Sequence, residues 1–175
     1  MDERRQLLRE RSIFYGTLLG VYLCIKFIFV PLGLTRPLFG LLFLAGTFAV
    51  PVVAAVLGTR FRIREFGGEM SFGEGFSFSM RMFMYAFLLA AAGHFVYFQF
   101  IDNGMLFNSL MESVDTLKQM GAEMKEATGQ MEENVDMMRS TTPINIVVSL
   151  LTQNLFFAVI LSPINALLIM KKKRN

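Results

Sequence analysis

Several polar and charged side chains lie inside long apolar stretches of this sequence, where such groups are expensive to bury. The candidate intramembrane polar residues are Lys26, Arg81, His94, Gln153, Asn154 and Asn165. Together they could line a polar path for a solute. Amides can equally hydrogen-bond between helices, and long basic side chains can extend to a membrane surface. We expect Lys26 and Arg81 to extend in this way, and His94 to be satisfied by a hydrogen bond inside the bundle.

No set of residues points to catalysis. The sequence has no paired carboxylates within an apolar stretch and no zinc-protease, nucleophile-elbow or Walker motif. One cysteine, Cys24, and one histidine cannot supply a zinc or iron–sulfur ligand set. We therefore expect a protein that is not an enzyme, with no catalytic residue, metal site or cofactor. The lack of carboxylates in the apolar stretches also disfavours a cation-coupled transporter.

A second group of residues precedes the third apolar stretch. The candidate interaction residues are Arg60, Arg62, Arg64, Ser71, Phe72, Gly73, Glu74, Gly75 and Phe76. Ser71 and Glu74 have the spacing of a capping box, and Glu74 near a helix N-terminus suits the helix dipole. Gly73 and Gly75 permit tight backbone turns. The element could simply start a helix, or it could form a docking or ligand surface with the arginines.

Four apolar stretches are long enough to cross a bilayer, whose core requires about 20 helical residues. They run over residues 13–32, 38–58, 76–101 and 144–170. Hydrophobic residues make up 54% of the chain and the mean hydropathy is +0.49, which is too apolar for a soluble surface. We expect an all-α polytopic membrane protein with one membrane domain over residues 1–175. The first stretch is too long for a cleaved signal peptide and lacks a small-residue cleavage site.

Prolines and small residues predict how these stretches connect and pack. Residues 31–37, PLGLTRP, predict a tight turn between the first two spans. Thr142 and Pro143 predict the N-cap and first residue of the fourth span. Small residues at helical spacing favour close helix contacts, either inside the bundle or at a dimer seam: Gly16 with Gly20, and Ala54 with Gly58.

Basic residues are distributed unequally between the two sides of the expected bundle. Eleven lie in the N-terminal tail, the link between the second and third spans, and the C-terminus, against four on the other side. The positive-inside rule places the eleven in the cytoplasm, so we expect both ends of the chain there. Juxtamembrane arginines commonly orient a protein and hold anionic lipid, and a nucleic-acid partner is therefore not expected.

The segment of residues 103–141 is polar and is expected to lie outside the cytoplasm. From Asp102 to Pro143 the chain carries eight acidic and three basic residues. Apolar residues recur there in alternating steps of four and three, as in a heptad coiled-coil seam. This candidate helix seam comprises Leu110, Val114, Leu117, Met124, Met131, Val135 and Met138. The pattern predicts one long amphipathic helix, or two helices broken near Gly129.

This seam has three candidate binding partners. It could lie on the membrane or on the outer ends of the bundle, or it could pair with a copy of itself or with another protein's helix. Its methionines could also offer thioethers to Cu(I). Copper is disfavoured because no cysteine or histidine accompanies the methionines, which commonly fill cores.

The order of these features resembles a known family. The run EMSFGEGFSFSM before the third span looks like the I-S-F-G-E-A-F element of the bacterial inner-membrane family named domain of unknown function 4199. The resemblance continues through YFQFID, the Met/Glu-rich segment and SPINALLIMKKK, and departs at Gly75, where alanine is expected. It implies a small four-span protein of the bacterial inner membrane without established activity. It also suggests a membrane-associated family 2 glycosyltransferase as a partner.

These features favour a non-enzymatic scaffold or accessory subunit that binds membrane lipid and either a protein partner or a second copy of itself. It would offer residues 60–76 to a cytoplasmic partner and the acidic segment to the periplasm. The alternative is a small transporter, channel or lipid-translocation component that uses Lys26, His94, Gln153 and Asn165. A periplasmic sensor is a third hypothesis.

Overall fold

The structure is a computed structural model that describes residues 2–119 and 125–171. Helices dominate these residues, and no strand is present among them. Four helices are long and apolar enough to cross a membrane. They are α1 (Asp2–Thr35), α2 (Pro37–Arg64), α3 (Phe72–Val96) with its π-helical continuation η1 (Tyr97–Ile101), and α6 (Pro143–Ile169). The prediction of an all-α protein with four membrane-spanning helices is confirmed.

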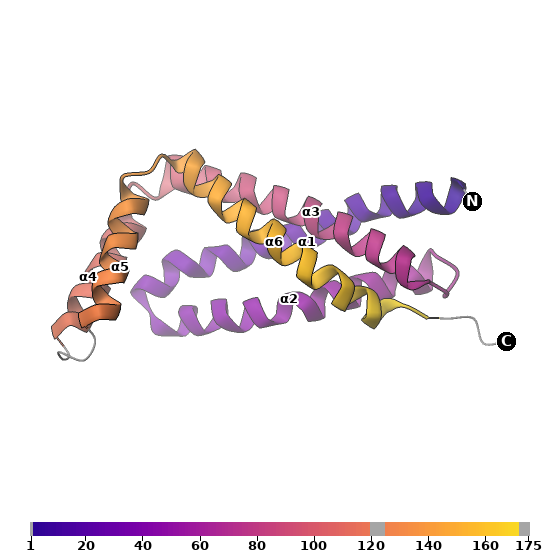
Figure 1. Cartoon of the computed structure of the whole chain (residues 1–175), viewed down its shortest axis with the longest axis horizontal. Helices are drawn as coiled ribbons and strands as arrows, with labels where there is room; N and C mark the ends of the chain where they lie inside the picture. The colour runs from indigo at the N-terminus through magenta and orange to yellow at the C-terminus, as the bar shows by residue number, and fades with distance from the viewer. Residues whose placement is uncertain (1, 120–124, 172–175) are drawn as a thin grey trace.

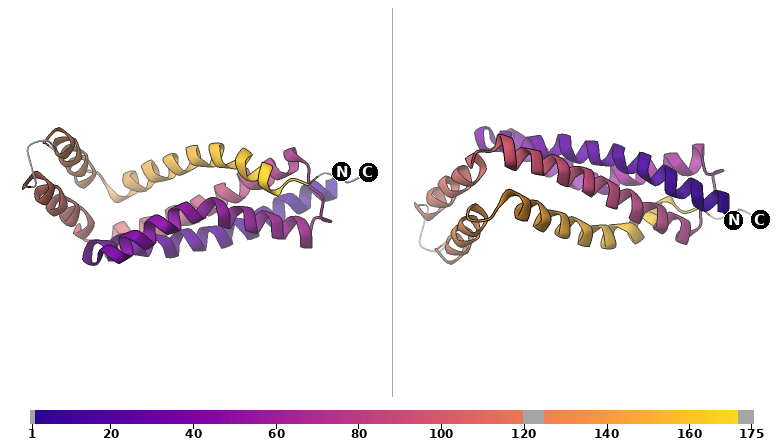
Figure 2. Two further views of the ribbon diagram at one scale, coloured as in Figure 1. Left: turned by 90° about the horizontal axis from the view of Figure 1, so that it is seen from below. Right: turned by 90° about the horizontal axis from the view of Figure 1, so that it is seen from above.

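The four long helices lie side by side as an elongated bundle (Figure 1). The start of α1, the α2–α3 connection and the end of α6 lie together at one end, which we call the basic end. Two shorter helices, α4 (Met105–Gln119) and α5 (Lys125–Arg139), form a hairpin at the opposite end. Figure 2 shows that this hairpin is inclined to the bundle axis.

Helix α3 is the central element of the bundle, because α1 and α6 both pack along it and α2 packs mainly on α1. Phenylalanines fill the core near the basic end. The rings of Phe61 on α2 and Phe78 on α3 are stacked with centroids 4.5 Å apart, and Tyr15 on α1 packs on both. Ring pairs of this kind add to the burial of apolar area and favour a specific packing.

Small residues allow the closest helix contacts, and they do so inside the chain. A Cβ atom added at Gly16 would lie 2.7 Å from the Tyr85 Cβ and 2.8 Å from the Met82 carbonyl oxygen on α3. One added at Gly58 would lie 2.9 Å from the Ile169 side chain on α6. These positions therefore serve bundle packing, as expected of small residues at helical spacing.

The turn between the first two spans is shorter than the sequence predicts. Helix α1 continues through Pro31 to Thr35, and only Arg36 separates it from Pro37 at the start of α2. A proline inside an apolar helix is tolerated when neighbouring groups satisfy the freed carbonyl, so Pro31 does not end the helix. At the start of α6, Thr142 occupies the predicted N-cap, although its side chain forms no capping hydrogen bond.

In the α2–α3 connection the expected glycine turn lies at other residues, whereas the expected capping box is present. The turn uses Gly67 and Gly68, both with positive φ, whereas Gly73 and Gly75 are helical residues of α3. Gly75 instead packs against α6, where an added Cβ would lie 3.4 Å from the backbone of Ala166, at ordinary van der Waals distance. The predicted capping box is formed: the Ser71 hydroxyl accepts from the Glu74 N–H, and the Ser71 N–H donates to the Glu74 carboxylate.

The segment between the third and fourth spans forms two helices, but the predicted break near Gly129 is wrong. Gly129 lies within α5, and α4 ends at Gln119. Along the candidate seam, Val114 and Val135 are buried, whereas Leu110 and Leu117 are half-buried and Met131 and Met138 are exposed. Met124 lies outside the described residues. A hairpin arises because α4 and α5 pack against each other, which buries part of the seam within this segment.

An ion pair between the hairpin helices gives a first testable prediction. The hydrogen bond from Lys118 to Glu132 raises the pKa of the Lys118 amino group. Because the pKa is higher in the paired state, the pair stabilises the hairpin below about pH 10.4, the ordinary value for lysine, and this stabilisation is lost as the pH rises further. Spin labels on α4 and α5 should report a small widening between about pH 9 and pH 11.5, the range around that value. Lys118→Gln should remove that pH dependence, and an identical profile in the variant would contradict the prediction.

Candidate functional site

An interior pocket of about 190 Å³ lies where all four spans meet. Three of the candidate intramembrane polar residues line it: Lys26 from α1, His94 from α3 and Asn154 from α6. Apolar side chains, among them Phe43 from α2 and Phe87 from α3, form the rest of the wall. The fold thus brings together polar residues that are up to 128 positions apart in the sequence.

The Lys26 side chain crosses from α1 to α2 within the helix hairpin. Its amino group donates a hydrogen bond of 3.1 Å to the Thr47 hydroxyl on α2 and lies 4.7 Å from the centroid of the Phe43 ring. The stem packs over Gly46, where an added Cβ would lie 3.1 Å from the Lys26 Cγ. Thr47 and Gly46 lie at the same level of the hairpin as Lys26, so the expectation that Lys26 extends to the outer surface is wrong. Space over Gly46 and the acceptor on Thr47 hold the side chain across the helices instead.

His94 lies against α1, with its ring centroid 4.1 Å from that of Phe27. Its Nδ1 atom is buried and has no hydrogen-bond partner among the described residues. The expectation of a histidine satisfied within the bundle is therefore wrong for this nitrogen, because no polar group of the described residues reaches hydrogen-bonding distance of it. An unpaired buried polar atom raises the free energy of the folded state unless a ligand or water satisfies it.

The other three polar candidates lie elsewhere. Asn165 is buried and donates a 2.8 Å hydrogen bond to the Ser79 hydroxyl, which links α6 to α3. Gln153 is exposed and faces a hollow between α5 and α6, beside Met137 and Met138. Arg81 is half-buried on α3. A single polar path through the four residues of the transporter hypothesis is therefore not formed, since only Lys26 and His94 among them share a cavity.

A second hollow, which we call the membrane groove, lies between α1 and α3. It has a volume of about 490 Å³ and an almost wholly apolar lining that includes Val21, Ile25, Ile28 and Val96. These four residues are exposed on the surface that a bilayer would cover. Phe27 and His94 line both the groove and the interior pocket.

At the basic end, several of the candidate interaction residues hold the chain together. Arg62 donates a 2.8 Å hydrogen bond to the Ile169 carbonyl oxygen at the end of α6. Glu74 pairs with Arg4 of α1 at 3.1 Å. Met70 and Lys171 exchange two backbone hydrogen bonds of 3.1 and 2.9 Å, which join the α2–α3 connection to the end of α6.

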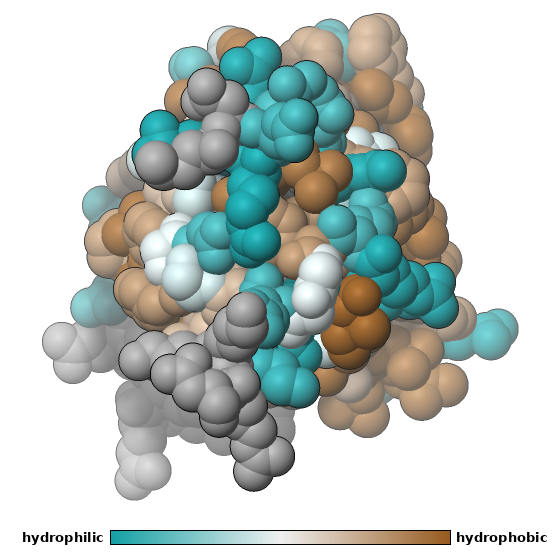
Figure 3. Space-filling view, turned by 90° about the vertical axis from the view of Figure 1, so that its right-hand side faces the viewer, coloured by the Kyte–Doolittle hydropathy of each residue, from teal (hydrophilic) through white to brown (hydrophobic). Residues whose placement is uncertain are grey.

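Other residues of that set remain on the surface. Arg60, Arg64, Phe72 and Phe76 are exposed, and the two phenylalanine rings are stacked with centroids 6.3 Å apart. Gly73 is also exposed, and nothing lies within 4 Å of a Cβ added there. Figure 3 views the molecule from this end and shows hydrophilic side chains gathered between hydrophobic borders.

Sequence reasoning missed two carboxylates that organise the structure. Asp102 is buried at the start of the hairpin and accepts hydrogen bonds from the Tyr97 hydroxyl and from the N–H groups of Gly104 and Leu106. The Asp-Asn-Gly run was an available signal, because such residues start turns and cap helices. Glu65 pairs with Arg11 at 2.7 Å and accepts from the Tyr15 hydroxyl. No local sequence pattern predicts these contacts of Glu65.

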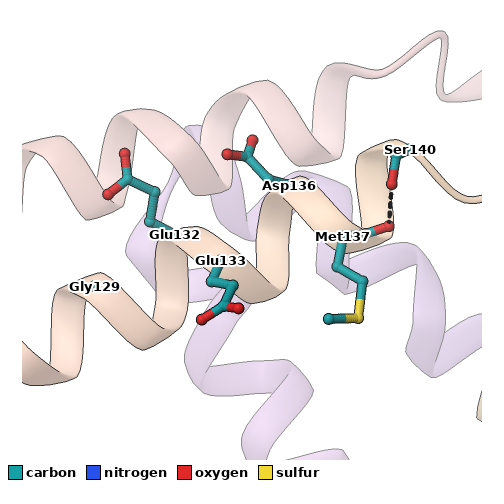
Figure 4. Close-up of a pocket in the computed structure, with 6 residues that line it drawn as sticks. All are labelled: Gly129, Glu132, Glu133, Asp136, Met137 and Ser140. Carbon is teal, nitrogen blue, oxygen red and sulfur yellow. Dashed lines mark hydrogen bonds between the residues drawn. The ribbon is translucent and has the colours of Figure 1, made fainter.

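The hairpin carries an open acidic hollow on α5 (Figure 4), lined by Glu132, Glu133 and Asp136 among others. Glu132 and Asp136 point to one side of the helix and Glu133 points to the other. Within residues 2–119 and 125–171, no group of three or more metal-binding side chains is arranged to hold an ion. The three carboxylates therefore do not converge on one point.

The helices, the interior pocket and the apolar exterior define a polytopic all-α membrane protein. A family described as "Protein of unknown function (DUF4199)" matches residues 14–171, and the chain belongs to this family. The resemblance seen in the sequence is thereby confirmed. No curated protein and no solved structure matches the chain.

Proposed function

We propose that this protein is a non-enzymatic accessory subunit of the bacterial inner membrane whose basic end docks a cytoplasmic protein partner. One observation carries the proposal: hydrogen bonds and an ion pair cross-connect the basic end, which nevertheless leaves Arg60, Arg64, Phe72 and Phe76 exposed. Arginine and aromatic side chains are enriched among residues that dominate binding energy. A preorganised surface loses little conformational freedom when a partner binds.

The cytoplasmic position of this end rests on its basic residues. Of the eleven that favour a cytoplasmic location, those within the described residues belong to segments that start, connect or end at the basic end. In this orientation both ends of the chain are cytoplasmic and the α4–α5 hairpin is periplasmic. Labelling of single cysteines at Arg9 and Ser113, in a protein whose Cys24 is replaced by serine, with a membrane-impermeant maleimide checks it. Only the hairpin position should react in cells whose outer membrane alone is permeabilised.

The positive charge of the basic end indicates which kind of partner surface it would bind. Exposed arginines favour an acidic surface with planar carboxylates. The membrane-associated family 2 glycosyltransferase suggested by the sequence resemblance is the first partner to test. Its enzymatic activity would remain its own, and the accessory subunit would hold or orient it at the membrane.

Site-specific photocrosslinking tests this docking surface. A benzoylphenylalanine at Phe72, in cells that co-express the same organism's glycosyltransferase, should give one crosslinked product. Arg60→Gln with Arg64→Gln should reduce its yield about fivefold, because about 1 kcal/mol of binding free energy corresponds to that factor. The matched control is Arg36→Gln with Arg139→Gln, two arginines that lie away from the basic end. Crosslinking to lipid alone, or an equal loss in the control, would overturn the proposal.

A further inference from the structure

The interior pocket and the membrane groove meet at the contact between α1 and α3. They share only two lining residues, Phe27 and His94, whose rings form the wall between them. One side of this wall is apolar and faces the surface that a bilayer would cover, whereas the other side holds an amino group and an amide. A molecule that occupied both hollows would need an apolar part and a polar part.

We propose that the groove and the pocket form one binding site for a single-chain anionic amphiphile, with its hydrocarbon chain in the membrane groove and its carboxylate or phosphate at the Lys26 amino group. Binding requires the Phe27 and His94 rings to part, since they separate the two hollows. This site goes beyond the docking function of the basic end, from which it is separated along the bundle.

The charge of the head group follows from the partners of Lys26. Within the part of the chain that the structure describes, its amino group contacts only the Thr47 hydroxyl and the Phe43 ring, and no carboxylate pairs with it. A lysine among apolar side chains without an anion carries a large desolvation penalty. An anionic head group would offset that penalty, and His94, whose Nδ1 is unpaired, and Asn154 line the same cavity and could complete its polar contacts.

The size of the two hollows fits one chain with a small head group. The interior pocket, at about 190 Å³, is smaller than the roughly 300–1,000 Å³ of a typical ligand site, so it suits a head group rather than a whole ligand. The groove, at about 490 Å³, falls within that range and offers almost no polar lining. The membrane is therefore the source of the ligand, because the apolar chain enters from the side that lipids would cover.

Binding to the full-length protein in dodecyl maltoside tests the chemistry of the ligand. The probes are oleate, oleyl phosphate, oleyl alcohol and inorganic phosphate, each titrated and followed by native mass spectrometry. We expect one equivalent of oleate or oleyl phosphate to bind, and the tighter of the two identifies the head group. Oleyl alcohol should bind at least about tenfold more weakly, because a hydrogen bond to a charged group is lost. Equal binding of the alcohol, or equally tight binding of inorganic phosphate, would overturn the proposal.

Variants then locate the site. Lys26→Met should weaken binding of the preferred amphiphile about tenfold. Arg81→Met, which removes a positive charge from α3 outside both hollows, is the matched control and should bind as the parent does. Ala90→Leu should also weaken binding, since it fills the interior pocket while the charge stays intact. Should Lys26→Met fail to fold, Lys26→Gln and Ala90→Leu test the same two features, the charge and the space. Unchanged affinity in a folded pocket variant, or equal loss in Arg81→Met, would contradict the assignment.

Discussion

Replacing Gly16 by alanine should lower the melting temperature of the purified protein by several degrees, although it adds a single methyl group. The new Cβ would lie 2.7 Å from the Tyr85 Cβ and 2.8 Å from the Met82 carbonyl oxygen, and one of these contacts is with backbone. Helices α1 and α3 would have to separate along the most extensive contact of the bundle. Overpacking of this kind costs about 1–3 kcal/mol, and leucine at the same position should prevent native assembly.

The matched control is Gly40→Ala in α2, where nothing lies within 4 Å of the added Cβ. This change should be neutral or slightly stabilising, because alanine restricts the unfolded chain more than glycine does. Thermal unfolding in detergent, followed by circular dichroism, compares the two variants with the parent. Equal melting temperatures for Gly16→Ala and Gly40→Ala would show that α1 and α3 do not approach as closely as the structure has them.

The second large effect is expected from Asp102→Ala, which should detach the α4–α5 hairpin from its fixed position. Three donors, on Tyr97, Gly104 and Leu106, lose their acceptor at a buried site. A loss of about 3 kcal/mol is expected, since hydrogen bonds to a carboxylate are among the stronger ones. The loss is local, because the four spans pack without this residue.

Limited proteolysis in detergent measures this effect. Asp102→Ala should be cleaved within the hairpin at least about tenfold faster than the parent, with the spans left intact. Glu112→Ala removes an exposed carboxylate from α4 and serves as the control. Tyr97→Phe removes one of the three hydrogen bonds and should fall between the two. A cleavage rate for Asp102→Ala equal to that of the control would show that this carboxylate does not anchor the hairpin.

The four spans could be predicted because membrane helices are specified by length and composition over about 20 residues. The capping box at Ser71 and Glu74 was predictable for a similar reason, since both partners lie within one helical turn. The residue at which α1 ends could not be predicted, because proline, here Pro31, commonly ends a helix in a soluble protein but is tolerated inside an apolar membrane helix.

The candidate site was predicted only in part. The polar residues were visible individually, but their grouping depends on which helix faces meet, and composition does not determine that. Lys26, His94 and Asn154 share a cavity, whereas Gln153 and Asn165 face other surroundings. Arg62 illustrates the same limit, since its carbonyl partner lies 107 positions away.

That separation has a consequence for the order in which the protein matures during synthesis. Arg62 and the surface of Gly58 leave the ribosome long before Ile169, the residue that both contact. At about 5–20 residues per second, the 107 residues between Arg62 and Ile169 take roughly 5–20 s to translate. During this interval the contacts of α1 with Glu65 and Glu74 can form, whereas those of Arg62 and Gly58 with α6 cannot. A chain that stalls within α6 would expose the Gly58 surface of α2 to the quality-control machinery of the membrane.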